Sequence, residues 1–189
     1  MDSAVLRAMS RWPSVPRCTG WLALDQRGQW WMCNQAGPTT WPRDAQGRLD
    51  KTDAGPVLHA GLAAFIGRNY TVDATGAWYF QNGPQRVDVS LEAAPWIIRL
   101  HHGAQAGDSW STHTDQTCRA ESLWLDDRGQ VWLRTDLGPG LLHSADMSLL
   151  ADHLDAPGTQ LCLPNAAPLT IGHFTEPPAE FFGFRPDPP

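Results

Sequence analysis

Apolar and polar residues alternate along three short stretches of the chain, and each stretch is interrupted by an Asp and, three residues later, by a Gly. The stretches are residues 22–32, 70–80 and 123–133. An Asp that opens a turn and a Gly that closes it are typical of a three-residue hairpin loop, in which the Gly is left-handed. The pattern therefore predicts three β-hairpins.

The loop length determines which residues face each other across a hairpin. In the third hairpin Leu123 faces Leu133 and Trp124 faces Trp132, so one face is aliphatic and the other carries the tryptophan pair beside Asp126. A shift by one residue would mix large apolar and polar side chains on both faces. The same register defines the core faces of the other hairpins: Leu22, Leu24, Trp30 and Met32 in the first, and Tyr70, Val72, Trp78 and Phe80 in the second.

Aromatic side chains recur at the same place on the second face of each hairpin. They are Trp31, Tyr79 and Trp132, and in the third hairpin Trp124 faces Trp132 across the two strands. Two interpretations stay open: a helix or a second sheet covers these rings, since exposed tryptophan pairs promote aggregation, or the rings form a platform for a ligand or partner. The repeat itself is compatible both with duplication and with one good turn sequence used three times.

The segments around the second hairpin predict a helix and more strands. Pro56 suits a first helical turn, an apolar stripe follows, and Arg68 ends the helix. The stripe consists of Leu58, Leu62, Phe65 and Ile66. Residues 86–91 alternate and residues 96–100 are mostly apolar, so 70–100 is predicted to be a four-stranded antiparallel meander.

The second half of the chain carries a similar mixture of elements. After the third hairpin we expect a turn at 138–140, a short helix over 145–154 capped by Ser144, and a last strand over 160–163. The Pro-rich end is expected to be an extended tail pinned by its aromatic residues, Phe174, Phe181, Phe182 and Phe184.

These elements predict an α+β fold, built from antiparallel β-meanders and hairpins with one helix per half, in two small β-rich units. The expected organisation is an N-terminal arm (1–20), a hairpin–helix–meander unit (21–104), a polar linker loop (105–120), and a second β-rich unit with a short helix and a Pro-rich tail (121–189).

The composition of the chain bears on its binding partners and on its location in the cell. The 189 residues carry a formal net charge of −6, and the 14 basic residues are scattered, which disfavours nucleic-acid and anionic-membrane binding. There is no apolar run of membrane length, and we expect a cytoplasmic protein. The four cysteines form no C-x-x-C pair and are expected to be reduced and mostly buried.

The chain resembles a proteobacterial family of unknown function, the one numbered 1285 or a sister family. The resemblance is carried by the D-x-x-G-x-W hairpins, the helix running into residues 65–70, the stretch 92–97, and the motif at 133–136. Asp136 stands where that family usually has Asn. The resemblance covers residues 22–155 and implies two small α+β units, with no established activity or catalytic residue to transfer.

Candidate chemistry is sparse. His101, His102, His113 and Cys118 are weak candidates for a metal site, because imidazole and thiolate suit zinc, but their spacing matches no known ligand pattern. There is no nucleophile elbow and no phosphate-binding loop, so we assign no catalytic residue and no cofactor.

Three hypotheses for function follow. The first is a non-enzymatic module that binds a small ligand or a protein, or acts as a regulator. Its contact residues would be Trp31, Tyr79, Trp124 and Trp132, with Arg86, Arg99 or Arg134 contacting an anion. The second is an enzyme with a site at the junction of the halves, where His101, His102 or His113 acts near Asp115 and Glu121. The third is a structural subunit of a homodimer, in which the aromatic faces bury each other.

Overall fold

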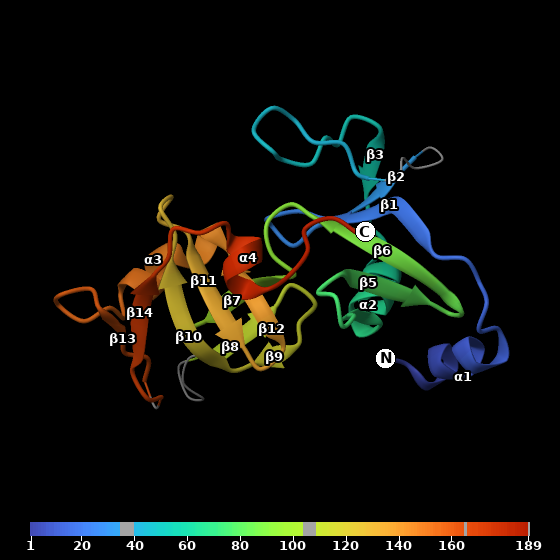
Figure 1. The fold of residues 1–189 in the computed structure, drawn as a ribbon. Coiled ribbons are helices and arrows are strands. Elements are labelled where there is room, and N and C mark those ends of the chain that lie inside the picture. Colours follow the sequence, from blue (N-terminus) through green and yellow to red (C-terminus); the bar gives the residue numbers. More distant parts are fainter. Residues whose placement is uncertain (35–39, 104–108, 165, 189) are drawn as a thin grey trace. The chain divides into compact units, whose positions relative to one another are not determined.

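The computed structural model describes residues 1–34, 40–103, 109–164 and 166–188, and the chain divides into two compact units. Unit 1 comprises residues 1–93 and 184–189, and unit 2 comprises residues 94–183. Each unit has its own sheet, as Figure 1 shows. The predicted α+β class is confirmed, with two α-helices in the described part of each unit where one was expected.

The elements of unit 1 are α1 (Ser3–Arg11), β1 (Cys18–Leu24), β2 (Trp30–Cys33), β3 (Ala54–Pro56), α2 (Ala60–Arg68), β4 (Tyr70–Val72), β5 (Trp78–Asn82) and β6 (Gln85–Leu91). Those of unit 2 are β7 (Trp96–His101), β8 (Ser109–Thr112), β9 (Thr117–Cys118), β10 (Ala120–Leu125), β11 (Val131–Thr135), β12 (Gly138–Leu142), the 3₁₀-helix η1 (Ser144–Asp146), α3 (Met147–Ala151), β13 (Gln160–Leu161), β14 (Leu169–His173) and α4 (Pro178–Phe182).

The division of the chain differs from the predicted boundaries. Residues 94–103 belong to unit 2, and residues 184–189 belong to unit 1. In the region predicted as a linker, residues 109–118 contain β8 and β9, and residues 105–108 lie outside the described residues. The predicted N-terminal arm contains α1.

The predicted register of all three hairpins is confirmed. Leu22 pairs with Met32, Tyr70 with Phe80, and Trp124 with Trp132, and the neighbouring pairs follow in step. The closing glycines Gly28, Gly76 and Gly129 have φ angles of 82°, 82° and 72°, in the left-handed region that the loop requires.

An Asp carboxylate binds the turn amides and a second side chain in each hairpin, an arrangement that we call the Asp clamp. One oxygen of Asp126 accepts hydrogen bonds from the amides of Arg128 and Gln130, at 2.9 and 2.8 Å. The other oxygen accepts the indole N–H of Trp132 at 3.1 Å. The clamp therefore fixes the turn and orients the side chain six residues after the Asp.

The same clamp recurs in the other two hairpins. Asp25 accepts two turn amides and the indole N–H of Trp31, the last at 2.9 Å. In the second hairpin Tyr79 occupies the aromatic position, and Asp73 accepts two turn amides and pairs with Arg86 at 2.8 Å. The Arg86 guanidinium lies 4.1 Å from the centroid of the Tyr79 ring, so it takes the place of the indole N–H.

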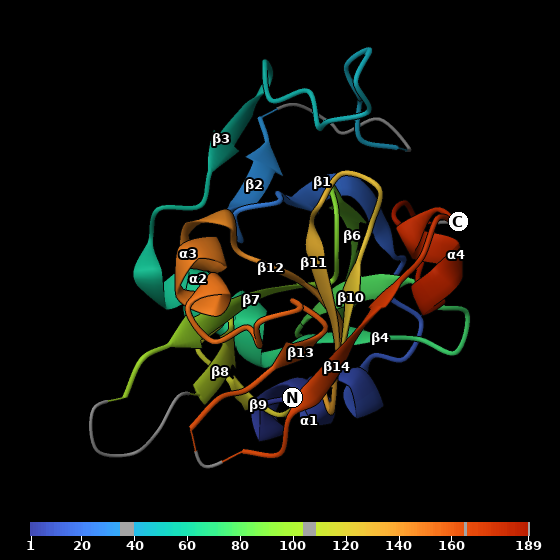
Figure 2. The same cartoon turned by 90° about the vertical axis from the view of Figure 1, so that its left-hand side faces the viewer.

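The two units share one strand topology. The sheet of unit 1 has the order β3-β2-β1-β6-β5-β4, and the sheet of unit 2 contains β9-β8-β7-β12-β11-β10. Each pairing has the same direction in both units, including the parallel pairs β1 with β6 and β7 with β12. In unit 2, β14 adds to β10 in parallel and β13 follows at the edge, which Figure 2 shows from the side.

This correspondence supports duplication of a six-strand unit. The structural repeat does not coincide with the similarity between hairpin sequences. The counterpart of the third hairpin is the second, because both join the fourth strand of a unit to the fifth. The first and third hairpins resemble each other most in sequence but hold different positions in the fold. Their likeness is therefore one of turn chemistry.

Four local predictions were wrong. The meander has three strands, because β7 joins the sheet of unit 2, so that the predicted fourth strand begins a new unit after Pro95. Residues 138–140 are part of β12, and the turn lies at Asp136 and Leu137. The hydroxyl of Thr135 holds this turn, because it accepts a hydrogen bond from the amide of Leu137 and donates one to the carbonyl of Gly138.

The helix boundaries account for the other two errors. Helix α2 begins at Ala60, because His59 caps it by accepting the amide of Leu62 and Pro56 is still in β3. The second-half helix is a 3₁₀ turn followed by α3, and the side chain of His143 accepts the amide of Ala145 in the capping role expected of Ser144. Serine is a preferred helix cap and imidazole is an uncommon one, so the sequence favoured Ser144.

The Asp clamp predicts a large and local effect on stability. Replacing Asp126 with Ala removes the hydrogen-bond acceptor of two turn amides and of the Trp132 indole N–H. Trp132 is only 2 % exposed. We expect a loss of about 2–4 kcal/mol in the free energy of unfolding, measured by urea titration, since a buried donor loses a charged partner. The matched control is the exposed neighbour Asp127→Ala, which should change stability by less than about 0.5 kcal/mol. Equal effects of the two substitutions would contradict the clamp.

Candidate functional site

The aromatic pair of the third hairpin is covered inside unit 2 by the end of the chain. The Trp132 ring stacks on Phe182 of α4 with a centroid distance of 5.5 Å, and Trp124 meets Phe181 edge-on at 4.8 Å. Gly172 of β14 lies so close to the Trp124 ring that a methyl group there would overlap it. The predicted pinning by aromatic residues is therefore present, although the tail forms a strand and a helix.

Trp31 and Tyr79 are half-buried in unit 1 by a loop and by an arginine. Trp31 packs against the cluster of Ala23, Trp41 and Leu49, and the ammonium of Lys51 lies 4.9 Å from its ring centroid. Tyr79 lies under the guanidinium of Arg86. A helix covers the rings of the third hairpin, and other elements cover those of the first two.

The three arginines proposed as anion contacts all make contacts within their own units. Arg86 pairs with Asp73 and Asp88, and Arg99 pairs with Asp146 at 2.7 Å. Arg134 lies over the rings of α4 and donates to the carbonyl oxygen of Phe181 at 2.9 Å. An external anion would have to replace these contacts, which disfavours these positions as a ligand site.

The histidines of the enzyme hypothesis lie in unit 2 with separate contacts. His101 shares a hydrogen bond of 2.7 Å with Ser111, and His113 Nδ1 accepts the amide of Ile97 at 3.3 Å. The His102 ring stacks near His153, with 6.4 Å between centroids. In the described ranges no three His, Cys, Asp or Glu side chains lie in a group that could hold a metal ion. The structure does not bring these weak metal candidates together with Cys118.

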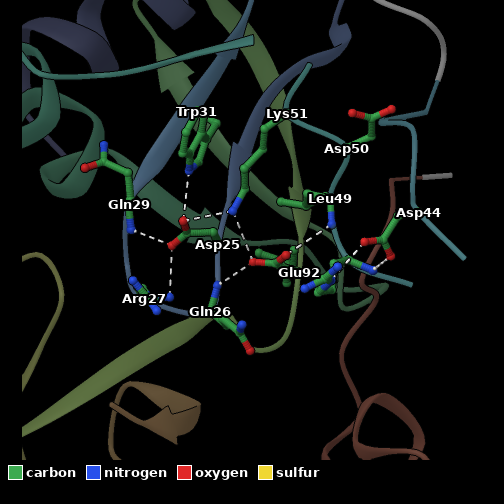
Figure 3. A network of polar contacts seen from close by, with 12 residues as sticks. Asp25, Gln26, Arg27, Gln29, Trp31, Asp44, Leu49, Asp50, Lys51 and Glu92 are labelled. Carbon is green, nitrogen blue, oxygen red and sulfur yellow. Dashed lines mark hydrogen bonds and ion pairs between the residues drawn. The ribbon is translucent and has the colours of Figure 1, made fainter. Parts of the chain in front are cut away.

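A charged network surrounds the first Asp clamp, as Figure 3 shows. Lys51, the single lysine of the chain, contacts Asp25 at 3.1 Å and Glu92 at 3.5 Å. Glu92 also accepts the amides of Gln26 and Leu49. The two carboxylate side chains are 7 % and 5 % exposed, and the network joins the turn after β1, the loop that precedes β3, and the residue after β6.

Hydrogen bonding determines the ionisation of Asp25. Burial opposes the charged form, but donors from Trp31, the turn amides and Lys51 outweigh it and lower the pKa of Asp25. A lowered pKa in the folded state means that the contribution to stability is complete above the unfolded pKa of about 3.9 and is lost as the pH falls through the folded pKa. The network therefore stabilises the folded unit at neutral pH.

A small apolar cavity lies in unit 1 between α2 and the core face of the sheet. It has a volume of about 210 Å³, and its walls include Leu22, Phe80 and Val87 from the strands and Leu62 and Ile66 from α2. The polar groups among the described lining residues are the thiol of Cys18 and the amides of Asn82 and Gln85. The described walls of the cavity therefore carry no charged side chain.

The short helix explains why this cavity exists. A nine-residue helix is about 14 Å long, whereas six strands at a spacing of about 4.8 Å span about 24 Å. Helix α2 packs on β5 through an edge-on contact of Phe65 with Phe80, at 5.5 Å, and leaves the core face of β1 and β2 partly uncovered. Met32 and Leu62 in the cavity wall are accordingly 39 % and 36 % exposed.

Trp21 completes the exposed part of the wall, with an exposure of 38 %. Simple alternation would place it on the face opposite to Leu22. Gly20 has a φ of 71°, and the pairing of β1 with β6 shifts between Cys18 and Leu22, so the strand is irregular where Trp21 enters the cavity wall. Sequence reasoning missed this site, and the glycine beside an isolated Trp was the signal available.

Together these features describe a two-unit α+β protein with an apolar cavity in unit 1. The chain belongs to the family described as "Protein of unknown function (DUF2946)", whose model matches residues 1–177. The predicted resemblance to the family of unknown function numbered 1285, or a sister of it, is thus confirmed.

A solved structure from the DUF1285 family shares the fold. A DUF1285 family protein from Silicibacter pomeroyi DSS-3 aligns with a TM-score of 0.53 and 10% identity, over 90% of this chain and 94% of that one. A second, from Shewanella baltica OS155, aligns with a TM-score of 0.46 and 15% identity, over 72% of this chain and 94% of that one. No curated protein matches the chain. Among the described helices, none combines the length and apolar character needed to cross a bilayer.

The charged network predicts a pH-dependent effect of its lysine. In Lys51→Met two buried carboxylates lose their shared cation, so we expect the pKa of Asp25 to rise and stability at pH 7 to fall by about 1–3 kcal/mol in urea titrations. The loss should shrink as the pH falls through the folded pKa of Asp25, because the protonated carboxyl group no longer needs a cation. The control Arg48→Met removes an exposed ion pair with Asp44 and should cost less than about 1 kcal/mol. A loss of stability that is independent of pH would contradict a stabilising role of the ionised network.

Proposed function

We propose that the protein is a non-enzymatic binding module, and that the unit 1 cavity binds a small, neutral, mostly apolar molecule. The observation that carries the proposal is the cavity of about 210 Å³ with exposed apolar walls. For comparison, an apolar cavity of about 150 Å³ holds a benzene molecule. Ligand sites are typically concave and apolar with a few polar groups that orient the ligand, and the amides of Asn82 and Gln85 can do so here.

The charge distribution of unit 1 supports a neutral ligand. The cations nearest to the aromatic faces, Lys51 and Arg86, are paired with carboxylates. Arg17, which precedes the lining residue Cys18, pairs with the fully buried Asp88 at 2.8 Å. A charged ligand would therefore find no opposite charge on the walls described, and its desolvation would be uncompensated.

Cysteine footprinting with octan-1-ol as the probe tests the proposal. Cys18 lines the cavity, and burial raises the pKa of its thiol, so its reaction with N-ethylmaleimide is slow enough to follow. Octan-1-ol should slow the modification of Cys18, read peptide by peptide by mass spectrometry. The exposed Cys162 serves as an internal control whose rate stays unchanged.

A matched pair of variants locates the binding. Leu62→Asp places a charge in the cavity wall and should abolish protection of Cys18, while helix α2 tolerates an acidic residue in its first turn. Leu58→Asp, at a position that is 81 % exposed, should leave protection intact. The proposal fails if the alcohol protects Cys18 equally in both variants. It also fails if protection depends on protein concentration alone, which would assign this face to a second copy of the chain.

A further inference from the structure

A second cavity, in unit 2, has a different chemistry from the first. Its volume is about 380 Å³, and its apolar walls include Trp110, Leu161 and Leu169. Cys118 also lines it, and Arg119 is the one charged residue among the lining residues that the structure describes. The unit 1 cavity has no charged residue on its described walls, so the two hollows differ in the ligand charge that they accept.

The topology of unit 2 produces this cavity. Strands β9 and β13 are the two edge strands of the eight-stranded sheet, and residues of both line the same hollow. The sheet therefore curls until its ends approach without pairing. In unit 1 the connection from the third strand to the fourth carries helix α2, whereas in unit 2 Arg119 alone joins β9 to β10. The missing helix leaves space, and the connecting residue itself stands in the wall.

Asp136 holds the backbone of Arg119, and the guanidinium makes an exposed ion pair. Its amide donates to the carboxylate of Asp136 at 2.8 Å, and the amide of Asp136 donates back to the Arg119 carbonyl at 3.2 Å. The guanidinium pairs only loosely with Glu121, at 3.3 Å, and the two side chains are 75 % and 49 % exposed. Exposed ion pairs of this kind contribute little to stability, so another carboxylate can replace Glu121 at small cost.

We infer that the unit 2 cavity binds an anionic amphiphile, namely a carboxylate with an apolar chain. The chain occupies the hollow lined by Trp110, Leu161 and Leu169, and the carboxylate pairs with the Arg119 guanidinium at the cavity wall. A guanidinium binds a carboxylate with two parallel hydrogen bonds, which gives both affinity and orientation. This inference stands on a separate cavity and does not depend on the function proposed for unit 1.

Octanoate and octan-1-ol, which share a chain length but differ in charge, provide the test at pH 8.5. The readout is the modification of Cys118 by N-ethylmaleimide, followed by mass spectrometry, with Cys162 as the exposed internal control. Desolvation by burial, with the charge of Asp136, raises the pKa of Cys118 to about 11, so the unprotected reaction is slow and a further slowing is measurable. Octanoate should half-protect Cys118 at a concentration about tenfold below that of octan-1-ol, the size expected for one charge-assisted contact.

Variants assign the preference to Arg119. Arg119→Gln should remove the difference between the two probes, and Arg119→Lys should restore part of it. The control Arg128→Gln changes an exposed arginine in the third hairpin turn and should leave the difference unchanged. Ala167→Trp, an exposed position in the cavity wall, should weaken protection by both probes.

Two results would overturn the inference: equal half-protection by octanoate and octan-1-ol in the unsubstituted protein, or a preference for octanoate that survives Arg119→Gln. Because Cys18 reports on the unit 1 cavity and Cys118 on the unit 2 cavity, the same samples show which of the two proposals fails.

Discussion

The Asp clamp is the interaction on which the rest of each unit depends. A single carboxylate accepts two turn amides and, through its second oxygen, an indole N–H or a guanidinium. The turn amides would otherwise be unpaired, and the aromatic partner would have no fixed orientation on the outer face. By binding both at once, the clamp sets the hairpin register and supplies an apolar ring onto which further chain can pack. In unit 2, helix α4 packs on Trp132 for this reason.

Duplication of one strand topology, with different closing segments, accounts for the two cavities. In unit 1 a nine-residue helix closes the sheet and is too short to cover its core face. In unit 2 one residue takes the place of that helix, and the strands β13 and β14 with their connections fill part of the space. The same scaffold thus leaves an uncharged hollow in one unit and a hollow with a guanidinium at its wall in the other. The difference comes from the closing segments, because the paired strands correspond.

Local features could be predicted from the sequence, whereas features set by distant contacts could not. The register of all three hairpins follows from the loop length and the alternation of side chains, and it was predicted residue by residue. The assignment of β7 to the second sheet rests on a parallel pairing with β12 over forty residues away, for which no local signal exists. The covers of Trp31 and Trp132 come from Lys51 and Phe182, side chains separated from them by at least twenty residues. The aromatic residues that were predicted to contact a ligand therefore pack against side chains from distant parts of their own unit.

The distribution of charge in unit 1 connects the clamps with the cavity. Asp25, Lys51 and Glu92 form their network around Trp31 on the outer face of the sheet, and Arg17 and Arg86 pair with Asp88. Each of these buried or half-buried charges has an opposite charge within 3.5 Å, as burial in a low-dielectric environment requires. Among the described residues that line the cavity beneath α2, the side chains are aliphatic, aromatic, thioether, thiol or amide groups. The ion pairs that stabilise the outer face thus involve none of the residues that line the inner cavity.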